Sequence, residues 1–288
     1  MTGTLVGRQV GRIGFGTRQF VKCDPERAVD VLRQAVALGT KHIDTADFYG
    51  AGVANDRVRE ALYPYHDDIA LATKVGVVYD PTAGLTPAQR PEQLRFAVEA
   101  NLRRLGVEQL AVVYLRRVDT GPGLFATGDQ KVDLTSQLAE LVALRDAGKI
   151  GGIGLSNVNL TQLDTALPAG ISCVQNVYNV CERVYEPVLD ECRRHDIAWV
   201  PFFPLGSPAI PTKVAGYPAV IAMARDLDVT PTQLGLAWLL AHDPSILLIP
   251  GTTDPLHVEE NLGADKVRLD PANLAVLDGL APPASAAR

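Results

Sequence analysis

Three side chains at the ends of two predicted strands have the chemistry of a proton donor. Asp44 and Tyr49 lie in the segment "HIDTADFYG", and Lys74 follows the apolar run "IALAT". A buried lysine matched by a carboxylate can make a nearby tyrosine a better general acid. The pattern therefore predicts that Tyr49 protonates a carbonyl oxygen. In the alternative interpretation, Asp44 and Lys74 form only a buried ion pair, and Tyr49 is an ordinary loop aromatic.

The segments that must position these residues alternate between strands and helices. Short apolar runs are followed by polar turns and then by stretches with helical periodicity, such as "PERAVDVLRQAVALG". The expected strands span residues 12–15, 41–43, 69–73, 111–115, 150–155, 171–175, 197–201 and 246–249. This alternation within 288 residues predicts an α/β fold, the (β/α)8 or TIM barrel. A doubly wound sheet is disfavoured because "GFGTRQ" supplies only two of the three glycines of its fingerprint.

The two ends of the chain complete this arrangement. Two short β-like runs in "TLVGRQVGRIG" predict an N-terminal β-hairpin that closes the bottom of the barrel. No linker or shift in composition interrupts the chain, so we expect a single domain over residues 1–288. The last segment, "APPASAAR", is expected to be disordered or loosely docked.

The composition disfavours several classes of protein. A net charge of -6 and an isoelectric point near 5.4 argue against nucleic-acid binding, which usually requires a basic stripe. The chain has no long apolar run and no secretory signal pattern, so we expect a cytoplasmic protein without a membrane partner. Its four cysteines and five histidines lack zinc-type spacing, so we expect no metal.

Five motifs in order resemble those of the aldo-keto reductase superfamily, from Ile13 to about Leu280. They are "IDTADFYG", "LATKVG", "IGLSNV", "VQNVYN" and "IPGTTDPLHVEEN". The resemblance implies a (β/α)8 barrel that binds NADPH without a Rossmann fold and reduces aldehydes and ketones. It also implies a catalytic tetrad of Asp, Tyr, Lys and His, whose first three members match Asp44, Tyr49 and Lys74.

The same resemblance implies a cofactor site. The residues matched to its nicotinamide and pyrophosphate contacts are Gly16, Thr17, Ser156, Asn157, Gln175, Phe202, Leu205 and Ser207. Ser156, Asn157 and Gln175 would hydrogen-bond the carboxamide. Phe202 would stack on the nicotinamide ring, at a position that is often Tyr in the family. Phe should serve as well, because stacking needs only an aromatic face.

The adenosine end of this site departs from the family pattern. Gly251 and His257 stand where well-studied members have a lysine and an arginine around the 2′-phosphate, and Thr252 remains as a hydroxyl donor. Glu260 and Asn261 match the adenine contacts. We therefore expect NADPH as the cofactor, held partly by a helix N-terminus, with weaker discrimination against NADH than is usual.

The fourth member of the tetrad is replaced. The family pattern resembles "DLYQLHRPD", and "AVVYLRRVD" places Arg116 at the histidine position. A guanidinium has five donors and a fixed positive charge. Arg116 could ionise Tyr49 too readily for proton donation, or it could bind the developing alkoxide or a substrate carboxylate. His42, deeper on the same strand as Asp44, is interpreted as a satisfied core histidine.

These observations favour an NAD(P)H-dependent reductase of a carbonyl or conjugated enone, with Tyr49 as proton donor and Arg116 in the histidine position. One alternative is a cofactor-binding protein of the same fold with little turnover. Another is lyase or dehydratase chemistry at Lys74, which the pairing with Asp44 disfavours. The expected partner is a small-molecule carbonyl substrate, and the expected state is a monomer or weak homo-oligomer.

Three loops are expected to form the walls of the substrate pocket. They are "DPTAGLTPAQRP", "TGPGLFATGDQKVD" and "SPAIPTKVAGYP", whose Gly and Pro content predicts loops. The candidate pocket aromatics are Phe15, Phe48, Tyr79 and Phe125.

Overall fold

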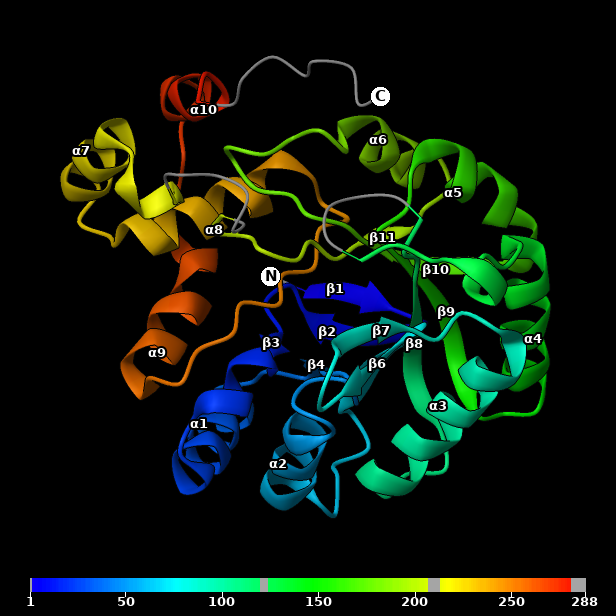
Figure 1. Ribbon diagram of the computed structural model, residues 1–288. Helices are drawn as coiled ribbons and strands as arrows, with labels where there is room; N and C mark the ends of the chain where they lie inside the picture. Colours follow the sequence, from blue (N-terminus) through cyan, green and yellow to red (C-terminus); the bar gives the residue numbers. More distant parts are fainter. Residues whose placement is uncertain (1, 120–123, 207–212, 281–288) are drawn as a thin grey trace.

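A curved parallel sheet forms the centre of the protein (Figure 1). The computed structural model describes residues 2–119, 124–206 and 213–280. Seven strands follow the spatial order β11-β10-β9-β8-β5-β4-β3. Their bounds are β3 Phe15–Gly16, β4 His42–Asp44, β5 Ala70–Val75, β8 Leu110–Arg116, β9 Ile150–Ser156, β10 Ile171–Gln175 and β11 Ala198–Trp199.

The sheet closes into a ring through residues 246–249. Ile246 bridges to Trp199 and Leu248 bridges to Ile13, both in parallel. The carbonyl of Leu248 accepts a hydrogen bond of 2.7 Å from the amide of Gly14. The predicted (β/α)8 barrel is therefore confirmed, although its eighth strand consists of isolated bridges.

Close backbone contact at this seam requires glycine. A Cβ on Gly251 would lie 2.3 Å from the carbonyl oxygen of Gly16, and a Cβ on Gly16 would lie 2.6 Å from that of Ile249. Real Cβ atoms do not approach backbone oxygens this closely. The first and eighth strand positions can therefore lie side by side only because both sites lack side chains.

Helices surround the sheet on its outer side (Figure 1). Their bounds are α1 Pro25–Ala37, α2 Val53–Leu62, α3 Pro91–Leu105, α4 Leu134–Asp146, α5 Leu160–Ala166, α6 Glu186–Arg194, α7 Pro218–Asp226, α8 Pro231–His242, α9 Pro255–Gly263 and α10 Pro271–Asp278. Capping residues fix several starts: the side chains of Asp24, Asp133 and Thr230 accept hydrogen bonds from first-turn amides. Within the described ranges, no helix has the length and apolar character needed to cross a membrane.

An antiparallel hairpin closes the bottom of the barrel, as predicted. β1 (Thr2–Leu5) pairs with β2 (Arg8–Gly11), and the buried side chains of Leu5 and Val10 pack against the barrel interior. The buried guanidinium of Arg12 follows this hairpin and donates to the carbonyls of Leu240, Asp243 and Ile246 at 2.9, 2.5 and 3.1 Å. These bonds tie the floor to the start of the eighth strand position.

The prediction of a loop over residues 80–91 is partly wrong. β6 (Val77–Asp80) and β7 (Gly84–Pro87) form a second antiparallel hairpin beside the barrel. The carboxylate of Asp80 accepts hydrogen bonds from the amides of Thr82 and Ala83 at 2.7 and 2.8 Å, and Gly84 has φ +75°. These features build a tight turn between the two strands. The Gly and Pro content indicated a loop but not the hairpin around it. The tail "APPASAAR" lies outside the described residues.

Candidate active site

A buried ion pair lies where two neighbouring barrel strands end. Asp44 is the last residue of β4, and Lys74 lies near the end of β5. The ammonium of Lys74 donates to Oδ1 of Asp44 and, at 3.1 Å, to the carbonyl of Thr45. Burial opposes the lysine charge, but Asp44 and then Tyr49 outweigh it and raise the pKa of Lys74. Lys74 is therefore held in its protonated form.

Tyr49 lies against this pair. The Nζ atom of Lys74 is 5.1 Å from the centroid of the Tyr49 ring, and a hydrogen bond with Tyr49 contributes to the raised pKa of Lys74. The ring of Phe48 meets that of Tyr49 edge-on, with centroids 5.1 Å apart. The structure thus brings Lys74 together with Asp44 and Tyr49, which come from a different segment of the sequence.

Arg116 is the last residue of β8 and is half-buried at the same end of the barrel. The Cζ atom of Arg116 lies 5.6 Å from the centroid of the Phe48 ring. Its carbonyl accepts a hydrogen bond of 2.9 Å from the side-chain amide of Gln89, which holds the end of the strand. Burial lowers the pKa of Arg116; the interaction with Tyr49 raises it, and Arg18 lowers it further. The guanidinium and Tyr49 therefore act on each other electrostatically.

Arg117 has a different, structural environment. Successive side chains of a strand point to opposite faces, and Arg117 turns away from the barrel interior. It pairs with Asp119, hydrogen-bonds Gln137, and donates to the carbonyl of Val132 at 3.2 Å. Its guanidinium is thus fully engaged in holding the segment after β8.

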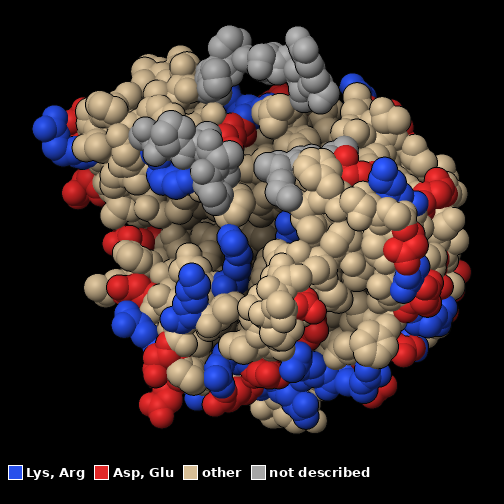
Figure 2. Space-filling model, in the orientation of Figure 1, with Lys and Arg blue, Asp and Glu red and all other residues tan. Residues whose placement is uncertain are grey.

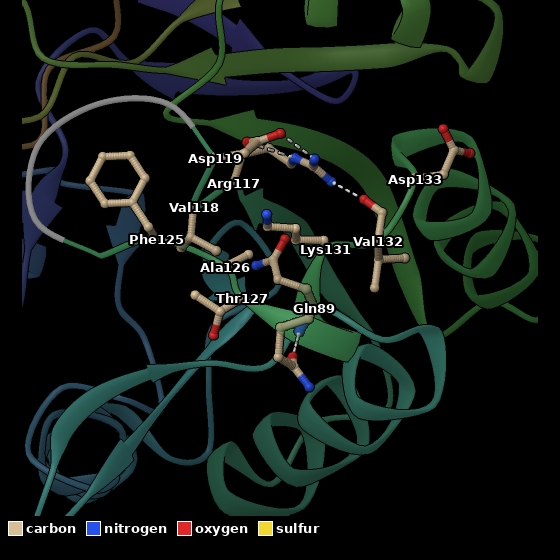
Figure 3. A pocket seen from close by; sticks show the side chains of 11 residues that line it. Gln89, Arg117, Val118, Asp119, Phe125, Ala126, Thr127, Lys131, Val132 and Asp133 are labelled. Atoms are coloured by element: carbon tan, nitrogen blue, oxygen red, sulfur yellow. Dashed lines mark hydrogen bonds and ion pairs between the residues drawn. The ribbon is translucent and has the colours of Figure 1, made fainter.

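A cavity of about 610 Å³ is formed by Gln89 and by the segments that follow β8 (Figure 3). Arg117, Asp119, Phe125 and Lys131 are among the residues that line it. It contains none of the four catalytic candidates. We therefore place the candidate chemistry at the barrel mouth and not in this cavity.

The predicted carboxamide-binding residues lie beside the ion pair. Gln175, at the end of β10, is fully buried and donates from Nε2 to Oδ2 of Asp44 at 2.9 Å. Within the described residues, its Oε1 atom is buried without a hydrogen-bond partner. Ser156 ends β9 and is 3% exposed, and Asn157 follows with φ +61°. An unpaired acceptor at this place fits a ligand that carries an amide N–H group.

The segment after β11 carries Phe202, predicted to stack on the nicotinamide ring, and Leu205 and Ser207, predicted to contact the pyrophosphate. Phe202 is half-buried, and its ring meets that of Phe203 edge-on with centroids 5.4 Å apart. Leu205 is half-buried and accepts a hydrogen bond from the amide of Val214. Ser207 lies outside the described residues. Thr17 is fully buried and donates its hydroxyl to that of Thr45 at 2.9 Å, so only the neighbouring backbone remains to line a ligand site.

The predicted adenosine-end residues gather at the start of α9. Thr252 is buried and accepts a hydrogen bond of 3.0 Å from the amide of Asp254. His257 is exposed, Glu260 is half-buried, and Asn261 is 7% exposed on the same helix. Gly251 presents its carbonyl to the side-chain amide of Gln19 at 3.0 Å.

Sequence reasoning missed two arginines near these sites. Arg27 of α1 donates to the carbonyl of Thr253 at 2.6 Å and so brings a cation to the adenosine end. Arg18 lies with its Cζ atom 5.5 Å from the centroid of the Phe203 ring. Both contacts join segments that are far apart in the sequence. The sequence offered one local indication for Arg18, which directly follows the "GFGT" segment, and none for Arg27.

The candidate pocket aromatics have different surroundings. Phe48 lies in the site, as described above. Phe15 is 3% exposed and packs against Phe20 in the core, with centroids 5.6 Å apart. Tyr79 and Phe125 are 43% and 58% exposed. Phe15 is therefore a packing residue, and Phe48 is the one in contact with the catalytic candidates.

His42 contradicts its interpretation as a satisfied core histidine. It is fully buried on β4, yet neither ring nitrogen has a hydrogen-bond partner among the described residues. Burial lowers its pKa to about 4, with Asp44 opposing and Lys74 adding to this shift. The imidazole is neutral at neutral pH because protonation inside the barrel would bury an additional charge.

This neutral histidine predicts acid sensitivity. Between about pH 6.5 and about pH 4, the unfolded chain binds a proton at His42 that the folded protein does not. As the pH is lowered through this window, the free energy of unfolding should therefore decrease by up to about 1.4 kcal/mol per pH unit. Urea titrations should show that His42→Asn has a shallower pH dependence than the wild type. Parallel curves would contradict the assignment, and His66→Asn, at an exposed site, is the control.

Comparisons with known proteins agree with this geometry. Residues 12–282 match the model of the Aldo/keto reductase family. The chain is 42% identical to pyridoxine 4-dehydrogenase of Escherichia coli (strain K12), over 97% of this chain and 98% of that protein. It is 28% identical to a probable aldo-keto reductase 1 of Glycine max, over 93% and 84%. A crystal structure of an aldo-keto reductase from Klebsiella pneumoniae with NADPH superposes with a TM-score of 0.82 at 26% identity, over 98% and 96%.

Proposed function

Because this chain belongs to the aldo-keto reductase family, we propose that it is an NADPH-dependent reductase of small aldehydes and ketones. The observation that carries the proposal is the buried Asp44–Lys74 pair, with Tyr49 against it at the carboxyl end of the barrel strands. In barrels of this class, chemistry takes place at that end.

The proton chemistry follows from these three residues. Lys74, kept protonated by Asp44, stabilises negative charge on the Tyr49 oxygen as that hydroxyl gives up its proton. NADPH, when bound, supplies the hydride that the carbonyl carbon accepts. Tyr49 gives its proton to the carbonyl oxygen, so the product is an alcohol, and solvent returns a proton to Tyr49. Arg116 stabilises the negative charge that develops on the carbonyl oxygen.

The side chains present fit NADPH. The unpaired Oε1 of Gln175 suits the carboxamide N–H, and Ser156 and Asn157 end the neighbouring strand. The close contact between Gly16 and Gly251 leaves bare backbone at the first and eighth strand positions. At the adenosine end, Thr252, His257 and the start of α9 would hold the 2′-phosphate. NADH remains a second cofactor to test, because Gly251 stands where the family pattern has a lysine at the 2′-phosphate.

Pyridoxal is the substrate we propose to test first. A relative 42% identical over nearly the whole chain is named pyridoxine 4-dehydrogenase. The reverse of that activity reduces an aromatic aldehyde to a primary alcohol. The aromatic rings of Phe48 and Phe203 give the mouth of the barrel a surface suited to a planar ring.

Arg116 also favours a second candidate function, a cofactor-binding protein of this fold with little turnover. A permanently charged guanidinium stands where the family pattern has a histidine, so the group that would position the carbonyl for reduction is changed. A Schiff-base lyase is less consistent with the site, because Lys74 is held in its protonated form.

Two measurements separate these functions. Quenching of protein fluorescence by NADPH tests cofactor binding, and loss of NADPH absorbance with pyridoxal or other aldehydes tests turnover. We expect saturable binding and steady oxidation of NADPH in the presence of pyridoxal. Binding without turnover across aldehydes, ketones and enones would favour the second candidate. Absence of NADPH binding would reject both.

A further inference from the structure

Two arginines at the barrel mouth have no acidic partner among the residues that the structure describes. Arg116 ends β8, and Arg18 begins the short 3-10 helix η1 (Arg18–Lys22) after the first strand. Within residues 2–119, 124–206 and 213–280, neither guanidinium forms an ion pair. Each instead lies over an aromatic ring, Arg116 on Phe48 at 5.6 Å and Arg18 on Phe203 at 5.5 Å. Figure 2 shows Lys and Arg side chains around the central hollow of this face.

This arrangement is costly without an anion. A half-buried guanidinium stays charged, and an uncompensated charge away from water raises the free energy of the site. Arg18 adds to the cost, since its charge contributes to the lowered pKa of Arg116. The carboxylate of Asp44, which lies in the site, is already occupied by Lys74 and Gln175. A ligand that carries negative charge would compensate the half-buried guanidinium of Arg116, and the exposed guanidinium of Arg18 would add to the attraction.

The position of Arg116 fixes where that charge must lie on the ligand. In the proposed reaction Tyr49 reaches the carbonyl oxygen of the substrate. The ring of Phe48 contacts both the ring of Tyr49, at 5.1 Å between centroids, and the guanidinium of Arg116, at 5.6 Å, so Arg116 lies close to the same oxygen. A guanidinium presents parallel N–H groups in one plane and therefore binds two oxygen atoms that lie side by side in that plane. An aromatic aldehyde with an ionised hydroxyl on the adjacent ring carbon has this pair of oxygens. The aromatic rings behind the arginines suit the rest of such a ligand.

We propose that Arg116 and Arg18 form an oxyanion subsite that selects aromatic aldehydes with an ionised ortho-hydroxyl group. The inference rests on the proposed reductase function and names its substrate class. Arg116 binds the carbonyl oxygen and the phenolate oxygen together, and Arg18 adds positive charge at the phenolate. Pyridoxal belongs to this class, since its hydroxyl is on the ring carbon next to the one that bears the aldehyde.

Equilibrium binding with NADP⁺ present tests the subsite without turnover. The probes are a salicylaldehyde with a nitro group para to its hydroxyl, which is ionised at neutral pH, and its O-methyl ether, which cannot ionise. We expect the wild type to bind the phenolate at least about tenfold more tightly than the ether. In Arg116→Met and, separately, Arg18→Met, this ratio should fall to about twofold or less. Equal binding of both probes by the wild type would overturn the proposal.

Further variants and a rate measurement complete the test. Arg116→Lys keeps the charge but loses the planar fork, so it should recover only part of the ratio. The matched control is Arg225→Met, which removes an 82% exposed arginine from α7 and should leave the ratio unchanged. Failure of the proposed function gives a different result: no NADPH oxidation with either probe, while the binding ratio still reports on the subsite. An unchanged ratio in both arginine variants, with native circular dichroism, would overturn the subsite alone.

Discussion

Replacement of Tyr49 with phenylalanine should lower kcat/KM for aldehyde reduction by roughly 10²–10⁴-fold. The change removes one hydroxyl and keeps the ring that lies 5.1 Å from the Lys74 ammonium and edge-on to Phe48. Packing in the site is therefore preserved, and only the proton donor is lost. Stopped-flow and steady-state measurements of NADPH oxidation check the rate. Fluorescence titration should show NADPH affinity within about threefold of the wild type.

The matched control for this change is Tyr79→Phe. Tyr79 is 43% exposed on β6, so loss of its hydroxyl should leave kcat and KM unchanged. If Tyr49→Phe kept more than half of the wild-type rate, another group would have to protonate the substrate. Lys74 would then be the first candidate, because its protonated ammonium lies 5.1 Å from the centroid of the Tyr49 ring, whereas the guanidinium of Arg116 does not give up a proton.

The sequence was sufficient for the barrel because its signal is local. Each apolar run and the glycine-terminated helix that follows it are visible within about thirty residues, which is the size of a βαβ unit. Asp44 and Lys74 follow such runs directly, so their meeting at one end of the barrel follows from the parallel arrangement alone. The same reasoning predicted that Gln175 lies nearby.

The parts that sequence reasoning missed depend on contacts between distant segments. Arg18 and Phe203 are brought together only by closure of the ring through the bridges at Ile13 and Trp199. The β6–β7 hairpin depends on the Asx turn at Asp80, which a loop-like composition conceals. His42 shares a face with Asp44, but only the packed interior shows that its ring nitrogens are unpaired. Periodicity identifies which face a residue is on, and not what lies opposite it.

The largest effect on stability should come from breaking the buried ion pair. Lys74→Met leaves Asp44 as a buried carboxylate to which, among the described side chains, only Gln175 donates, at 2.9 Å. Loss of one member of a buried pair costs about 3–5 kcal/mol. Asp44→Asn should cost a similar amount, because it leaves the Lys74 ammonium buried without a counter-charge. Urea denaturation followed by circular dichroism measures both changes in the free energy of unfolding.

A double variant tests whether the cost comes from the unpaired charge and not from lost packing. Asp44→Asn combined with Lys74→Met removes both charges, so it should be more stable than the sum of the single changes predicts. The matched control is Lys41→Met, which breaks the exposed pair with Asp68 at 3.0 Å and should cost only a small fraction as much. If the double variant were strictly additive, the charges would not be coupled in the folded protein. The proposal that Asp44 keeps Lys74 charged, and that this charge stabilises the Tyr49 oxygen, would then be wrong.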